Sequence, residues 1–168
     1  DSWSQVADLK DKSISRLTKT GDLIFAAIWT EGVAYNDSCF NAACAWTITA
    51  GPADDKFVRE VIGGPPQNPG DSPSWMLFAT ATTIYRRDGQ GWVLANPAPQ
   101  PTGNVFSLVQ DGEKIYAGTE NSGVWVSINK GHAWEKISGL DATIREMVID
   151  KTGKLIVATF KNGVWAWR

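Results

Sequence analysis

Three short turns of this sequence carry aromatic, carboxylate, amide and amine side chains that together could hold a sugar. The turns are Trp29-Thr30-Glu31, Glu120-Asn121-Ser122 and Phe160-Lys161-Asn162. An aromatic ring stacks on the apolar face of a sugar, and carboxylates and amides bond to its hydroxyl groups. The predicted ligand-binding residues are Trp29, Glu31, Glu120, Asn121, Lys161 and Asn162. The alternative for each residue is a local role, in which the polar side chains shape the turns and Trp29 packs inside.

Each of these turns follows an apolar run that recurs four times along the chain. The runs are LIFAA from Leu23, MLFAT from Met76, KIYAG from Lys114 and LIVAT from Leu155. We align their alanines, which are Ala26, Ala79, Ala117 and Ala158. A second apolar segment follows each run, and a Trp then follows in three units, as Trp46, Trp92 and Trp134. A period of roughly 40–45 residues with four strands per unit is typical of a β-propeller blade.

The fourth Trp of this pattern stands at the beginning of the sequence. The segment SWSQV from Ser2 aligns with AWEKI from Ala133, which makes Trp3 the missing residue. The sequence therefore predicts an all-β fold, a four-bladed β-propeller closed by pairing of an N-terminal strand, residues 2–8, with the C-terminal blade. Such closure removes open sheet edges, which promote aggregation. The alternative is that the four units belong to a larger ring.

We expect residues 1–168 to form a single β-propeller domain. The blades are predicted at approximately 13–49, 57–95, 105–138 and 144–168, the last completed by 2–8. The Pro- and Gly-rich segment 65–74 has no strand or helix periodicity and is predicted to be an inserted loop. No long stretch shows the periodicity of an amphipathic helix.

The segment Ser127–Trp134, SINKGHAW, resembles the Asp-box (BNR) repeat of sialidase-like propellers, whose motif is Ser/Thr-x-Asp-x-Gly-x-Thr-Trp. This sequence has Asn129 in place of the Asp and Ala133 in place of the Thr. Tyr85–Trp92 keeps the Gly and the Trp of the motif in a shorter hairpin. The resemblance implies a structural fold-back between the third and fourth strands of a blade. In such a turn the short polar side chain bonds the backbone, and the Trp is buried.

The resemblance does not extend to catalytic residues. Sialidases of this family use three Arg on a shared anion, a Tyr–Glu nucleophile pair and an acidic Asp. The Arg residues of this sequence do not recur at equivalent strand positions, and no Tyr is placed with a Glu near the axis. We therefore expect no catalytic residues. A glycoside hydrolase that uses two carboxylates is the third interpretation, to be tested by substitution of Glu31 or Glu120.

Charge and composition restrict the partners. The net charge is −2 with both signs interspersed, which argues against the clustered Lys and Arg of a nucleic-acid groove. No apolar run is long enough for a membrane-spanning helix. We expect no cofactor and no metal, since His132 is the only His and the sequence has one pair of cysteines. The sequence does not predict the oligomeric state or the identity of the ligand.

The two cysteines, Cys39 and Cys44, fall in one loop, CFNAAC. Across a predicted hairpin they could face each other at disulfide distance, which predicts a secreted or periplasmic protein. The alternative is a pair of free thiols. The function predicted first is a lectin-like, carbohydrate-binding module without enzymatic activity. The second is a protein-docking or structural module that uses this loop and segment 65–74.

Overall fold

The computed structural model describes residues 5–36, 45–51, 57–68, 71–89, 91–95, 101 and 103–167. These residues form fifteen β-strands and one turn of 3-10 helix, η1 (Ala7–Leu9). The all-β fold predicted from the sequence is confirmed. No helix among the described residues is long and apolar enough to cross a membrane.

The strands form four antiparallel sheets, which we name A to D in chain order. Sheet A contains β1 (Ile14–Thr20), β2 (Leu23–Ile28), β3 (Gly32–Asn36) and β4 (Thr47–Ala50). Sheet B contains β5 (Glu60–Gly63), β6 (Met76–Ala79), β7 (Ile84–Arg87) and β8 (Val93–Leu94). Sheet C contains β9 (Val105–Asp111), β10 (Lys114–Thr119), β11 (Val124–Ser127) and β12 (Glu135–Lys136). Within the described residues, sheet D contains β13 (Ile144–Ile149), β14 (Leu155–Thr159) and β15 (Val164–Ala166).

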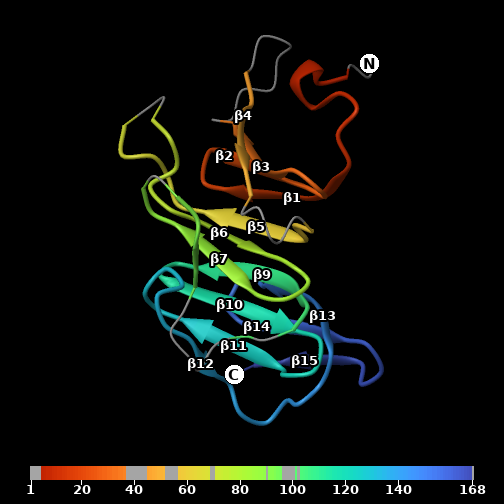
Figure 1. Ribbon diagram of the computed structural model, residues 1–168. Helices are drawn as coiled ribbons and strands as arrows, with labels where there is room; N and C mark the ends of the chain where they lie inside the picture. Colours follow the sequence, from red (N-terminus) through yellow and green to blue (C-terminus); the bar gives the residue numbers. More distant parts are fainter. Residues whose placement is uncertain are drawn as a thin grey trace.

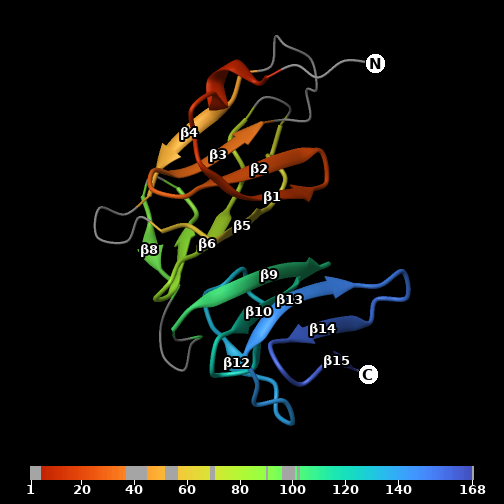
Figure 2. The same cartoon turned by 90° about the vertical axis from the view of Figure 1, so that its right-hand side faces the viewer.

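Each sheet adds its strands in sequence order, and its first strand lies innermost. Strand β1 contacts β5, β5 contacts β9, and β9 contacts β13. In both views sheet A lies at the top, sheet B lies below it, and sheets C and D lie together at the bottom (Figure 1 and Figure 2). Four antiparallel meanders whose first strands meet at the centre form a propeller-like arrangement.

The core lies between consecutive sheets. Phe25 of sheet A packs with Phe78 of sheet B, and Leu77 of sheet B packs with Ile115 of sheet C. These four side chains are fully buried. Burial of each large apolar side chain contributes about 1.5–3 kcal/mol. Because both faces of the central sheets are covered, their second strands are buried at nearly every position.

The strand register corrects the sequence alignment in two units. The small residues that pair with the first apolar residue of the third strand are Ala27, Ala79, Gly118 and Ala158. The predicted equivalence of Ala26 and Ala117 with the other two alanines is therefore wrong by one residue. Each of the four alanines aligned in the sequence is followed by a second small residue. The sequence pattern therefore does not decide which of these two residues points toward the next sheet.

The prediction of a closing strand over residues 2–8 is wrong for Ala7 and Asp8, which belong to η1 at sheet A. The Asp8 carboxylate accepts a hydrogen bond from the backbone N–H of Trp46 at 2.9 Å, and Leu9 packs on the core of sheet A. These contacts hold the segment beside β4 instead of β15. Residues 2–4, which include Trp3, lie outside the described residues.

The fold-back predicted for Ser127–Trp134 is present between β11 and β12. The side-chain Oδ1 of Asn129 accepts a hydrogen bond from the backbone N–H of Ala133 at 2.8 Å. Gly131 has a φ of 80°, which only glycine adopts without strain. Trp134 is 5% exposed. A short polar side chain therefore closes the turn and directs the Trp into the core, as the sequence indicated.

The inserted loop predicted at 65–74 is described at 65–68 and 71–74. The backbone N–H of Ser74 donates to the carbonyl of Pro65 at 3.3 Å, so the loop returns on itself. The hydroxyl groups of Ser72 and Tyr35 are 2.9 Å apart, which attaches the loop to sheet A. The predicted disulfide between Cys39 and Cys44 lies outside the described residues.

Candidate ligand-binding site

One end of the sheets carries a row of alternating aromatic and guanidinium side chains. At this end the second strand of each sheet finishes and the innermost strand begins. All four sheets contribute to the row, which we call the arginine–aromatic ladder: Trp29, Arg59, Phe106, Arg145 and Phe160.

Each guanidinium of the ladder lies between two rings. The Cζ of Arg59 is 5.4 Å from the ring centroid of Trp29 and 5.3 Å from that of Phe106. The Cζ of Arg145 is 4.7 Å from Phe106 and 4.6 Å from Phe160. These distances lie within the range of cation–π attraction. The rings contact both guanidinium groups without using their N–H donors.

Backbone hydrogen bonds set the positions of the ladder residues. They join the residue after each second strand to the residue before the innermost strand. The N–H of Trp29 donates to the carbonyl of Ser13 at 2.8 Å, and the N–H of Phe160 donates to Thr143 at 2.9 Å. The same sheet pairing that builds the fold therefore places these rings in a row.

The ladder has an excess of positive charge. Neither Arg59 nor Arg145 forms an ion pair with another described residue. The Nε of Arg59 is buried and has no hydrogen-bond partner among them. The ammonium of Lys161 lies 5.4 Å from the ring centroid of Phe160, at the end of the row. A planar guanidinium with free donors matches the two oxygens of a carboxylate or sulfate.

A second polar group, the axial cluster, joins the innermost strands of all four sheets. Its members are Arg16 and Thr18 on β1, Glu60 on β5, Ser107 on β9 and Glu146 on β13. The Nε of Arg16 is 2.9 Å from the Oε2 of Glu60, and an NH2 nitrogen is 2.6 Å from the Oε2 of Glu146. One guanidinium therefore ties sheet A to sheets B and D.

Burial raises the pKa of Glu60 to about 7, although Arg16 and the hydroxyl of Thr18 act in the opposite direction. Glu60 is 3% exposed, so removal of water from its charged form is the largest effect. The negative charge of Glu146 raises the pKa of Glu60 further. Each member of the axial cluster bonds to at least one other member, so the cluster pairs both carboxylates with Arg16 and holds the sheets together.

Two of the predicted ligand-binding residues lie at the ladder. Trp29 is its first ring, and its other neighbour is Phe57, with a centroid distance of 5.4 Å. Lys161 lies over the last ring. Sheets A and D, which are far apart in sequence, thus contribute residues to the same row.

The other four predicted residues have local roles or no contact with the ladder. Glu31 pairs with Lys12 at 2.5 Å, and Glu120 accepts a hydrogen bond from Asn104 at 2.5 Å. The backbone N–H of Asn162 donates to the hydroxyl of Thr159 at 2.9 Å, which closes the turn. Asn121 is exposed. Glu31, Glu120 and Asn162 therefore have the local contacts stated as the alternative, and ligand binding by the four residues stays a prediction.

Sequence reasoning missed Arg59, Phe106 and Arg145. Each lies at the beginning of an innermost strand, next to a buried apolar residue. The signal was present, because β5, β9 and β13 each begin near an Arg or a Phe. The sequence alone does not show that these three strand ends meet at one place, so it could not predict the ladder.

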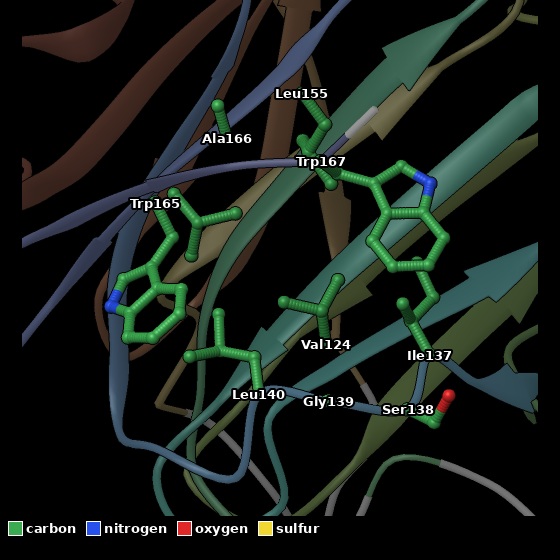
Figure 3. Close-up of a pocket in the computed structure, with 10 residues that line it drawn as sticks. Val124, Ile137, Ser138, Gly139, Leu140, Leu155, Trp165, Ala166 and Trp167 are labelled. Atoms are coloured by element: carbon green, nitrogen blue, oxygen red, sulfur yellow. The ribbon is translucent and has the colours of Figure 1, made fainter.

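An apolar pocket of about 130 Å³ lies between sheets C and D. Figure 3 shows the indoles of Trp165 and Trp167 on opposite sides of Val124 and Leu140. In sheet C the corresponding space, facing sheet B, is filled by Trp134. The pocket therefore lies where the fourth strand of a sheet places its Trp, and the described part of sheet D has three strands.

Comparison with known proteins concerns the fold. No protein-family model and no curated protein matches the sequence. The chain superposes on the computationally designed Ika4 protein with a TM-score of 0.67 and 8% identity, over 99% of this chain and 98% of that chain. It superposes on an ancestral GH74 enzyme with a TM-score of 0.68 and 17% identity, over 98% of this chain and 24% of that chain.

A third similar structure is the extracellular domain assigned to a one-component system of B. thetaiotaomicron. Its TM-score is 0.64 and its identity 13%, over 92% of this chain and 21% of that chain. The chain thus spans a quarter or less of the two natural-type proteins and nearly all of the designed one. At these identities the likeness supports the propeller-like arrangement of the sheets and carries no function.

Proposed function

We propose that this chain is a non-enzymatic, lectin-like module that binds acidic carbohydrate at the arginine–aromatic ladder. One observation carries the proposal. Arg59 and Arg145 are each held between two rings, and neither has a carboxylate partner among the described residues. Such guanidinium groups are preorganised, so little conformational entropy is lost when they bind a carboxylate or a sulfate.

The ring faces explain why an acidic sugar fits better than a neutral one. Both guanidinium groups cover the ring of Phe106, and Phe160 lies between Arg145 and Lys161. The faces available for stacking on a sugar are therefore reduced. The N–H groups at the edges of the guanidinium groups are available to a ligand, and they favour anionic substituents over hydroxyl groups. Trp29 and Phe57 offer an apolar surface beside them.

A binding role without catalysis agrees with how the nearby carboxylates are used. Glu31 and Glu120 are engaged by Lys12 and Asn104. Glu60 and Glu146 share Arg16 in the axial cluster. The resemblance of Ser127–Trp134 to the Asp-box supports membership of that repeat family. A secreted or periplasmic location follows from the proposed ligand, and free Cys39 and Cys44 thiols in the purified protein would count against it.

The test is a binding titration of the purified chain with an oligosaccharide of galacturonic acid and with its neutral galactose counterpart. The acidic sugar is expected to bind and the neutral one to bind at least about tenfold more weakly. Substitution Arg145→Gln should weaken the acidic sugar about tenfold or more, since a hydrogen bond between charged groups contributes about 1.5–3 kcal/mol.

Lys151→Gln is the matched control, because it removes the same charge from an exposed hairpin at the opposite end of sheet D. Its affinity should equal that of the unmodified chain. Equal affinity for the neutral and acidic sugars would contradict the anionic preference. Absence of binding to either sugar at millimolar concentration would contradict the function.

A further inference from the structure

Three cations follow one another along the arginine–aromatic ladder at short distances. The Cζ atoms of Arg59 and Arg145 lie 5.3 Å and 4.7 Å from the ring centroid of Phe106, so they are at most 10.0 Å apart. The Cζ of Arg145 and the Nζ of Lys161 lie 4.6 Å and 5.4 Å from the ring centroid of Phe160, so they too are at most 10.0 Å apart. Sheets B and D therefore place three positive charges in one row.

An aromatic ring separates the two cations of each pair. Phe106 is contacted by both guanidinium groups, and Phe160 is contacted by Arg145 and by the ammonium of Lys161. The ring atoms occupy the space in which a single carboxylate would have to lie to bridge the two cations. Each cation is therefore expected to hold an anionic group of its own. A ligand that uses the whole row must carry several anionic groups in series.

The carboxylates that follow the two arginines in the sequence are directed to the axial cluster. Glu60 and Glu146 each accept a hydrogen bond from the backbone N–H of the next residue, at 3.2 Å and 3.3 Å. Both also pair with Arg16. Strands β5 and β13 thus send their cations to the ladder and their carboxylates to the axis. The row is positive although the net charge of the chain is −2.

We propose that the ladder binds a linear polyuronate, a sugar chain whose carboxylates recur along its length, with separate carboxylates on Arg59, Arg145 and Lys161. The inference rests on the proposed function and narrows its ligand from an acidic carbohydrate to an acidic polymer. Once one carboxylate is bound, the others bind from within the same complex. Linkage of this kind raises affinity about 10²–10⁴-fold when all contacts can form at once.

Single-stranded nucleic acid is another linear polyanion, and the contacts of the rings disfavour it. Proteins that bind single strands stack the bases on open aromatic faces. In the ladder Trp29 is contacted by Arg59, and Phe106 and Phe160 are each contacted by two cations. Few ring faces are therefore open to bases. The cations themselves serve a sugar chain, whose charges lie on its substituents.

Chain length tests the inference. At one salt concentration, a hexamer of galacturonic acid should bind the full chain about 100-fold or more tightly than galacturonic acid itself, the lower end of the gain from linked contacts. Calorimetric titration measures both affinities. A smaller gain would overturn the inference, because several equivalent carboxylates on one ligand already give a modest statistical advantage. Tighter binding of an oligothymidylate of the same length would overturn the choice of a sugar chain.

Lys161→Gln tests whether the ligand extends along the row. It should weaken the hexamer about tenfold, because one charged contact is lost, and change the affinity of the single sugar less than about twofold, because Arg59 and Arg145 are still present. Lys151→Gln is the matched control and should change neither affinity. Equal effects of the two substitutions on the hexamer would overturn the inference.

Failure of this inference is distinguishable from failure of the proposed function. If the hexamer gains no affinity over the single sugar but both bind more tightly than their neutral counterparts, the ladder binds an acidic sugar and not a polymer. If neither acidic ligand binds at millimolar concentration, the proposed function and this inference are both wrong.

Discussion

At the scale of single residues, the environment of each charged group decides what it does. Arg16 meets Glu60 and Glu146 and serves the structure, whereas Arg145 meets two rings and keeps its donors. The two residues have the same chemistry and lie on equivalent innermost strands. Their roles differ because carboxylates approach one and aromatic rings approach the other.

Glu60 makes stability depend on pH. Its pKa is 4.5 in a model peptide and about 7 in the folded protein. The folded state therefore holds this proton more tightly, so the stability that Glu60 contributes is complete below pH 4.5 and is lost as pH rises to 7. The loss is about 3 kcal/mol. Denaturant unfolding of Glu60→Gln should lack this fall.

Glu135→Gln, an exposed change on β12, is the control for that experiment and should keep the pH dependence of the unmodified chain. The direct neighbours of Glu60 in the cluster are Arg16 and Thr18, and Glu146 lies across the shared guanidinium. If Glu60→Gln and the unmodified chain lose stability equally between these pH values, the buried position of this carboxyl group is wrong.

At the scale of elements, the turn before the third strand has different surroundings in sheets C and D. Gly123 and Gly163 both precede a third strand and have φ values of 71° and 74°. A Cβ on Gly123 would lie 2.2 Å from the carbonyl oxygen of Leu140, whereas nothing lies within 4 Å of a Cβ on Gly163. The difference arises because the segment that leads from sheet C to sheet D passes over Gly123, whereas no described segment passes over Gly163.

Alanine at these two positions should therefore have unequal effects. Gly163→Ala should cost about 1 kcal/mol, the typical penalty for positive φ. Gly123→Ala should cost roughly 1–3 kcal/mol more, because backbone must move to relieve the clash. Melting temperatures measured on dilute protein give the comparison. Equal losses would show that Gly163 is as crowded as Gly123.

The sequence could predict elements better than their contacts. Apolar runs, turn residues and the period gave the sheets and the fold-back at Ser127–Trp134, because these depend on local patterns. The closing strand failed at Ala7 and Asp8, since a single hydrogen bond to Trp46 and the packing of Leu9 place this segment. The four polar turn residues predicted to bind ligand were chosen by type, and their neighbours Lys12 and Asn104 are distant in sequence.

At the scale of the whole molecule, the order of the sheets creates the candidate site. Arg59, Phe106 and Arg145 lie 39 or more residues apart in the sequence and meet at one end of the arrangement, because each sheet begins its innermost strand there. Phe106 lies between Arg59 and Arg145 only when sheets B, C and D are neighbours. The contact of Phe106 with both Arg residues depends on the complete arrangement of sheets. No short motif in the sequence therefore predicts it.

The measurement that tests this account most directly is a ¹H–¹⁵N spectrum recorded during titration with the galacturonic acid oligosaccharide. The account predicts shift changes at the side-chain Nε–H of Arg59 and Arg145, at the indole N–H of Trp29, and at the backbone of Phe106 and Phe160. The hairpins at Gly112 and Lys151, at the opposite end, should not respond. Changes confined to the pocket between sheets C and D, or to those hairpins, would contradict the assignment of the ladder as the binding site.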